Sequence, residues 1–192
     1  MTDGAALVTH GTGRIGRAIS FALHRAGYAV AIHTPHAREA EILRDEIARA
    51  GGRACVAGAE LADHTAADLV TAAAAALGPL SLLVDNPSAA PDESGAPLFL
   101  SQAFAAQAAG DGASIVVILE RDGPAIAAGA LANTALHAAT PVLARVLAPT
   151  VRVNAVSVGP ESDPDEIAAA VVYLSRARSV TGVTLGVGSV PE

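Results

Sequence analysis

The sequence contains no lysine, no tryptophan and one cysteine among its 192 residues. The single cysteine, Cys55, cannot form a disulfide within the chain, which fits a reducing, cytoplasmic environment. With two tyrosines and three phenylalanines, the chain has few aromatic rings to stack on nucleic-acid bases. No apolar run approaches the ~18 residues of a membrane span, and no basic segment of a secretory signal begins the sequence. We therefore expect a cytoplasmic protein that does not cross a membrane.

Basic residues are scarce as well. The 12 arginines face 19 acidic residues, which gives a formal net charge of −7. Nucleic-acid binding needs a basic face to neutralise phosphates, so this balance argues against it. His24, His64 and His137 lack the spacing of metal ligands, and we expect no metal site. The length fits one domain spanning residues 1–192.

Apolar runs of strand length alternate with helical patterns along the chain. Strands are expected before Gly11 and at 28–33, 53–57, 80–84, 114–119, 151–158 and 184–187, and helices at 15–26, 34–50, 63–77, 98–109, 124–148 and 163–175. Thr34 and Asp163 are expected to cap helices that begin with a proline. Because a proline inside a helix costs about 3 kcal/mol, we expect a kink or a new start at Thr140-Pro141. This alternation predicts an α/β fold with a parallel, doubly wound sheet.

The segment from Leu7 to Gly16 reads LVTHGTGRIG, a strand that passes through a glycine-spaced turn into a helix. Gly11, Gly13 and Gly16 have the G-x-G-x-x-G spacing of dinucleotide-binding turns. In such turns glycines let the backbone approach a pyrophosphate, and the helix N-terminus presents free N–H groups to it. The alternative is a tight turn that holds no ligand.

With the order of segments in view, the chain resembles a short-chain dehydrogenase/reductase over nearly its whole length. The matching segments are 8–16 at the turn, Glu60-Leu61, Asp85-Asn86-Pro87-Ser88, 148–156 with its Val-Asn-Ala-Val run, Gly159-Pro160, 166–168 and Val180-Thr181-Gly182. Arg14-Ile15-Gly16 and the lack of an acid at the end of the second strand resemble the pteridine-reductase branch. The resemblance implies a Rossmann-type sheet of about seven strands in the order 3-2-1-4-5-6-7.

The resemblance also shows what is missing. The family's catalytic Tyr-x-x-x-Lys places fall on Gly129 and Asn133, and the chain has no lysine to supply. The position of the family's catalytic Ser or Asp falls on Glu120, which is the remaining candidate for proton transfer. Alternatively, Glu120 is an exposed acid of a loop with no catalytic role. The chain is shortened near 87–97, where the family has the first half of a helix, and near 159–163, where it has a substrate lid. His10 stands at the place of the family's first glycine.

If a cofactor binds, the sequence favours NADP(H) over NAD(H), because no acid is present to hold a ribose 2′-hydroxyl. Four basic residues are expected where a 2′-phosphate would lie: Arg14, His33, His36 and Arg38. Alternatively, they are solvent-facing basic residues at a sheet edge and bind no phosphate. The full set of candidate cofactor-binding residues is Gly11, Gly13, Arg14, Ile15, Gly16, His33, His36, Arg38, Glu60, Leu61, Asn86, Ser88 and Gly159.

These observations favour a pseudoenzyme that keeps an NADP(H)-type binding fold and has lost the family's reductase chemistry. One alternative is an NADPH-dependent oxidoreductase for pterins or carbonyls that uses an unusual acid such as Glu120. Another is a structural subunit that pairs with an intact homologue. The resemblance implies a homodimer or homotetramer formed through the alanine-rich helices at 98–109 and 125–147.

Overall fold

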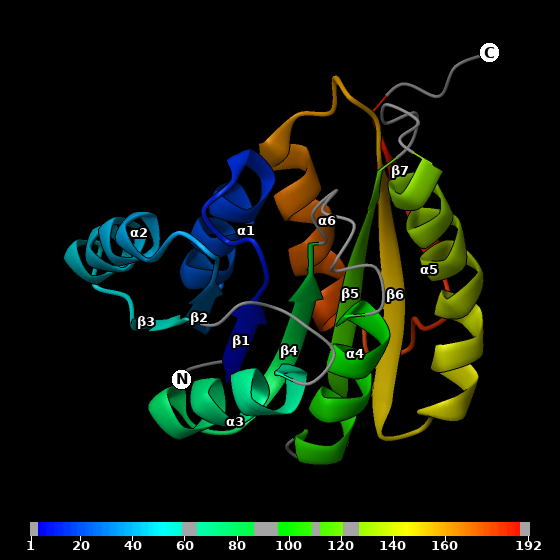
Figure 1. Ribbon diagram of the computed structural model, residues 1–192, viewed down its shortest axis with the longest axis horizontal. Coiled ribbons are helices and arrows are strands. Elements are labelled where there is room, and N and C mark those ends of the chain that lie inside the picture. Colours follow the sequence, from blue (N-terminus) through cyan, green and yellow to red (C-terminus); the bar gives the residue numbers. More distant parts are fainter. Residues whose placement is uncertain (1–3, 59–64, 87–95, 109–111, 121–126, 189–192) are drawn as a thin grey trace.

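The computed structural model describes residues 4–58, 65–86, 96–108, 112–120 and 127–188. Its strands are β1 (Ala5–Val8), β2 (Ala29–His33), β3 (Ala54–Ala57), β4 (Leu80–Asp85), β5 (Ala113–Glu120), β6 (Val151–Val158) and β7 (Thr184–Val187). Its helices are α1 (Arg14–Arg25), α2 (Ala37–Arg49), α3 (Ala66–Leu77), α4 (Ala96–Gln107), α5 (Ala127–Val146) and α6 (Pro164–Arg176). The strands form one parallel sheet in the order β3-β2-β1-β4-β5-β6-β7 (Figure 1), which confirms the expected α/β class and strand order.

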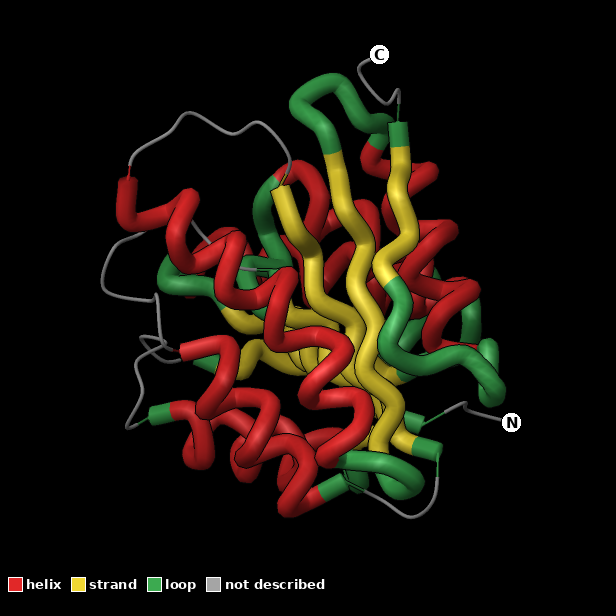
Figure 2. Tube along the Cα trace, turned by 90° about the vertical axis from the view of Figure 1, so that its right-hand side faces the viewer, coloured by secondary structure: helices red, strands yellow, loops and turns green. Residues whose placement is uncertain are grey.

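Helices cover both faces of this sheet, as Figure 2 shows. Alternate residues of each strand point to opposite faces, so Leu7 packs in one core and Val8 in the other. The core that contains Leu7 includes Leu69 of α3 and Phe104 of α4, both fully buried. The core that contains Val8 includes Ile19 of α1 and other buried residues of α2 and α6. Burial on both faces explains why the strands read as continuous apolar runs.

The predicted helix start at Thr34 was wrong, and of the two alternatives at Thr140-Pro141 the new start is excluded while the kink stays a prediction. Helix α2 begins at Ala37 rather than after a Thr34 cap, because the Thr34 hydroxyl oxygen accepts from the backbone N–H of His36 (3.3 Å) and turns the chain first. Helix α5 passes through Pro141 as one element. Thr140 therefore lies inside α5, where its hydroxyl donates to the Leu136 carbonyl (2.9 Å) instead of capping a second helix.

The predicted start of α6 is confirmed. Asp163 is its N-cap, the Asp163 carboxylate accepts from the N–H of Asp165 (2.9 Å), and Pro164 occupies the first helical position. The expected cap at Asp63 lies outside the described residues. Among the described helices, none is long and apolar enough to cross a membrane.

A buried arginine ties β6 to the end of α6. Arg152 is 6% exposed. Its Nη1 donates to the carbonyls of Leu174 (2.8 Å) and Ala177 (3.0 Å), and its Nη2 donates to that of Ser175 (2.8 Å). Burial lowers the pKa of Arg152, and an arginine still stays protonated at neutral pH. The guanidinium thus satisfies carbonyls that the last turn of a helix leaves without intrahelical partners.

Replacing this cation should destabilise the fold. We expect Arg152→Met to lower the free energy of unfolding by about 2–4 kcal/mol, since buried carbonyls lose their donors. Arg145→Met, which removes an exposed cation from the last turn of α5, should change it by less than about 0.5 kcal/mol. Urea denaturation of both variants measures this, and equal effects would contradict the capping role.

Candidate functional site

The turn between β1 and α1 depends on two close backbone approaches. A Cβ atom added at Gly16 would lie 2.2 Å from the carbonyl oxygen of His10, and one at Gly11 would lie 2.9 Å from Cγ2 of Ile32. The N–H of Gly11 also donates to the carbonyl of His33 at the end of β2 (2.8 Å). Glycine is therefore needed at both positions for packing, whether or not a ligand is present.

Gly13 differs from these two glycines. An added Cβ there would meet nothing nearer than the His10 carbonyl oxygen at 3.7 Å, and the residue is exposed. Gly13 is the N-cap of α1, yet no side chain caps this helix and its first turn contains no acid. The first N–H groups of a helix have no intrahelical partners. The N-terminus of α1 thus offers donors and a positive dipole end to an anion, and its residues fit a pyrophosphate.

Polar contacts join the ends of β1 and β4 beside this turn. The Thr9 hydroxyl donates to Oδ1 of the fully buried Asp85 (3.2 Å) and accepts from the N–H of Asn86 (2.8 Å). Asn86 thereby fixes the end of β4 against the glycine turn, and its role in binding a cofactor stays a prediction. Sequence reasoning did not assign a role to Thr9, although its position two residues before Gly11 marks the end of β1.

His10 adopts the backbone conformation that a glycine would adopt more easily. Its φ is +46°, a left-handed conformation that costs an L-residue about 1–2 kcal/mol. The ring lies against the end of β4, with Nδ1 2.9 Å from the carbonyl oxygen of Asn86, and meets the His33 ring edge-on at a centroid distance of 5.6 Å. These contacts hold the turn in place although its first glycine is absent.

The four basic residues that the sequence predicted together do not form one exposed group. His33 is fully buried beneath the turn. Arg14 reaches away from α2, because its Nη1 donates to the carbonyl of Ser162 (3.2 Å). His36 and Arg38 remain exposed at the start of α2. They are the basic side chains free to meet a phosphate at the end of β2.

A closed turn follows β6 where the resemblance expects a lid. The hydroxyl of Ser162 accepts from the N–H of Gly159 (2.9 Å) and donates to the carbonyl of Val187 at the end of β7 (2.9 Å). The N–H of Ser162 donates back to the carbonyl of Gly159 (3.1 Å). Arg14 therefore links the start of α1 to a rigid turn. The sequence predicted Gly159 as a site residue and did not indicate Ser162. Its position just before the Asp163 cap is the one sequence feature that could have pointed to Ser162.

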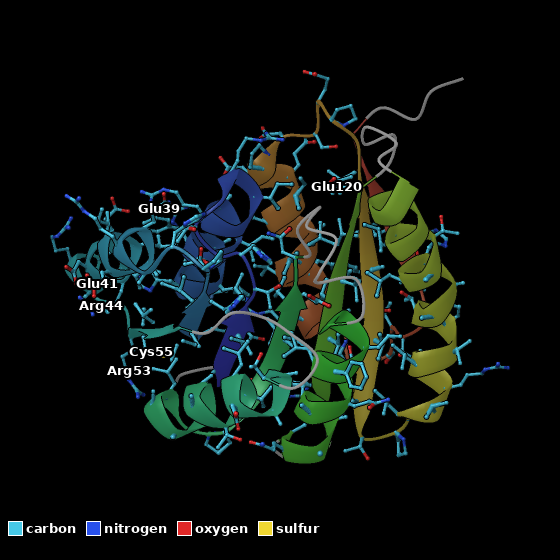
Figure 3. The ribbon with its side chains drawn as sticks, viewed as in Figure 1. Glu39, Glu41, Arg44, Arg53, Cys55 and Glu120 are labelled. Atoms are coloured by element: carbon cyan, nitrogen blue, oxygen red, sulfur yellow. The ribbon has the colours of Figure 1, made fainter. Side chains whose placement is uncertain are left out.

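Glu120, which the sequence predicted at the family's Ser or Asp place, is a described acid. Glu120 is the last residue of β5 and is exposed (Figure 3). Its main-chain carbonyl oxygen accepts from the side-chain amide of Asn133 on α5. Gly129 also falls within α5. The two tyrosines lie elsewhere, because the Tyr28 hydroxyl donates to Ser175 (3.3 Å) and Tyr173 is 57% exposed on α6.

Some predicted site residues add nothing further. Glu60, Leu61 and Ser88 lie outside the described residues. Ile15 packs against the core that contains Val8, so its side chain serves the attachment of α1 to the sheet. Within the described residues, no group of three or more histidine, cysteine or acidic side chains is arranged to hold a metal ion.

Comparisons with known proteins agree with this architecture. A structure of FolM alternative dihydrofolate reductase 1 from Brucella canis complexed with NADP is 29% identical, with a TM-score of 0.86 over 96% of this chain and 92% of that chain. The Brucella suis protein of the same name, also in complex with NADP, is 29% identical, with a TM-score of 0.87 over 97% and 94%. A dehydrogenase/reductase from Sinorhizobium meliloti 1021 is 26% identical, with a TM-score of 0.85 over 97% and 94%.

Sequence profiles cover both halves of the chain. No curated protein matches it. The profile described as short chain dehydrogenase matches residues 4–109, and the one described as short chain dehydrogenase-like protein matches residues 82–187. Each match spans more than half of the sequence, and together they span the described sheet. The chain therefore belongs to the short-chain dehydrogenase family.

Proposed function

We propose that this protein binds NADP(H) and does not carry out the carbonyl reduction of its family. The proposed binding of NADP(H) rests mainly on the N-terminus of α1. No side chain caps this helix, its first turn contains no acid, and its N-cap residue Gly13 is exposed. The Gly11–Gly16 turn and Arg14 would hold the pyrophosphate, and His36 and Arg38 would hold the 2′-phosphate. When bound, the dinucleotide can donate or accept a hydride. Structural neighbours that are complexed with NADP support this choice of ligand.

The loss of chemistry follows from the wall formed by β5 and α5. General acid catalysis contributes about 10²–10⁴-fold to a rate. Gly129 has no side chain, Asn133 carries no charge, and Glu120 is exposed to solvent at the end of β5. The chain also contains no lysine anywhere. A carbonyl oxygen at this wall would therefore meet neither the phenol nor the lysine that the family uses.

A substitution at Gly13 should change NADPH affinity and the free energy of unfolding in opposite directions. We expect Gly13→Asp to raise the free energy of unfolding by about 0.5–1 kcal/mol, because aspartate is a preferred N-cap and favours the helix dipole. The same carboxylate occupies the free N–H groups and repels a pyrophosphate, so NADPH affinity should fall at least tenfold. Gly13→Asn provides a cap of the same size without the charge and should lose less affinity. Undiminished NADPH binding by Gly13→Asp in calorimetry would contradict the proposed site.

Catalysis is tested separately with the wild-type protein. Incubation with NADPH and a panel of pterins, ketones and aldehydes should give no oxidation above the rate without protein. The alternative, a reductase with an unusual acid, predicts turnover that Glu120→Gln abolishes. Such turnover would contradict the proposed pseudoenzyme and show that the protein is an oxidoreductase.

We further propose that the protein forms a homo-oligomer through α4 and α5. Residues 96–107 contain no charged side chain, and α5 contains one arginine, in a chain whose net charge is −7. Phe99 on α4 and Val142 on α5 are 45% and 48% exposed, large values for apolar side chains. Two copies that repel one another elsewhere can meet on this layer, in which Arg145 is the one charged residue of the sequence of α4 and α5.

Light scattering after gel filtration tests this interface. The wild-type protein should elute as a dimer or tetramer, and Val142→Asp should elute as a smaller species because it buries a charge in the contact. Ile42→Asp changes a similarly exposed apolar residue (49%) on α2 and should leave the size unchanged. A monomeric wild-type protein would contradict the proposal, and co-purification with an intact homologue would favour the structural subunit.

A further inference from the structure

The sheet topology predicts that the two ends of the proposed dinucleotide lie over different strands. The strand order reverses between β1 and β4, and in doubly wound sheets the ligand lies in the crevice at that point, beyond the carboxyl ends of the strands. The 2′-phosphate of NADP belongs to its adenosine and is read at the end of β2. The nicotinamide therefore belongs over β4, β5 and β6.

Three described side chains at this second half are acidic. Glu120 ends β5 and pairs in register with Val158, the last residue of β6. Glu161, in the turn that follows, is exposed as well, and Asp85 ends β4 as a buried acid. Arg121 and Asp122, next in sequence, have opposite formal charges and lie outside the described residues.

Two described cations lie at the other end of the sheet from Glu120. Arg145 belongs to the last turn of α5, and Arg152 contacts the carbonyls at the end of α6. Arg14 belongs to α1, but its guanidinium donates to the carbonyl of Ser162, next to Glu161, so this cation reaches the turn after β6 and not the end of β5. The neutral amide of Asn133 bonds the main chain of Glu120, which fixes the end of β5 and leaves the carboxylate charge uncompensated by that contact.

We infer that Glu120 makes the site bind the oxidised dinucleotide more tightly than the reduced one. The two forms differ at the nicotinamide ring, which carries a positive charge when oxidised and none when reduced. A carboxylate at the end of β5 attracts the charged ring and has no such attraction for the neutral one. The inference rests on the proposed dinucleotide binding and makes the protein a binder that responds to the redox state of the NADP pool.

The expected size of this preference is modest because Glu120 is exposed. One unit charge that acts through solvent over several ångströms changes an equilibrium constant by about three- to tenfold. Dissolved salt screens such an interaction, so the preference should shrink as ionic strength rises. A preference that came from ring shape alone would not depend on salt.

Calorimetric titration with NADP⁺ and with NADPH tests the inference. For the wild-type protein we expect the dissociation constant of NADP⁺ to be about three- to tenfold lower than that of NADPH. Glu120→Gln should bring the two constants within twofold, chiefly by weakening NADP⁺ binding. Glu41→Gln removes the same charge from an exposed position on α2 (Figure 3) and should keep the wild-type preference. Circular dichroism verifies that both variants are folded.

The possible failures are distinguishable. If both forms bind and Glu120→Gln leaves their ratio unchanged, the role of Glu120 is overturned while dinucleotide binding stands. If Glu41→Gln changes the ratio of the two dissociation constants as much as Glu120→Gln does, the effect comes from net charge. That result would also overturn the inference. If neither form binds the wild-type protein, both this inference and the proposed function fall.

Discussion

The close contact of Gly16 with the His10 carbonyl is the constraint on which the site depends. A Cβ atom at residue 16 would lie 2.2 Å from that oxygen, so α1 can begin this close to β1 only with glycine there. The contact holds the N-terminus of α1 at the carboxyl end of β1, where the strand order reverses between β1 and β4. The Thr9 and Asn86 hydrogen bonds then fix the end of β4 beside it, and Arg14 fixes the turn after β6. The proposed anion site would thus follow from backbone packing before any ligand is considered.

In the proposed function, the same molecule has lost the reactive groups of its family. The contacts that a dinucleotide needs come mainly from backbone N–H groups, which survive changes of side chain. The resemblance places the family's tyrosine and lysine at Gly129 and Asn133 of α5, and the sequence contains no lysine. Binding and catalysis depend on different kinds of atoms. A chain of this family can therefore lose its chemistry while its fold and its ligand cradle remain.

The sequence predicted the fold well because its signals were local and repeated. The strands at Val151–Val158 and Thr184–Val187 and the Asp163 cap were placed correctly, since apolar runs and capping residues report local geometry. The start of α2 was misplaced because Thr34 forms a turn with His36 first, a competition between two local hydrogen bonds.

The site was harder to predict than the fold because it depends on contacts far apart in the chain. Arg14 and Ser162 are separated by 148 residues, and no local pattern shows that the guanidinium reaches that carbonyl. The burial of His33 likewise depends on how the ends of β1, β2 and β4 meet. Spacing identified the glycines, whereas the direction of each basic side chain required the folded molecule.

If a dinucleotide-binding site persists in this chain without its chemistry, calorimetric titration of the unmodified protein with NADPH should detect it. We expect saturable binding of one NADPH per chain. No binding at millimolar NADPH would contradict it and leave the glycine turn as a purely structural feature.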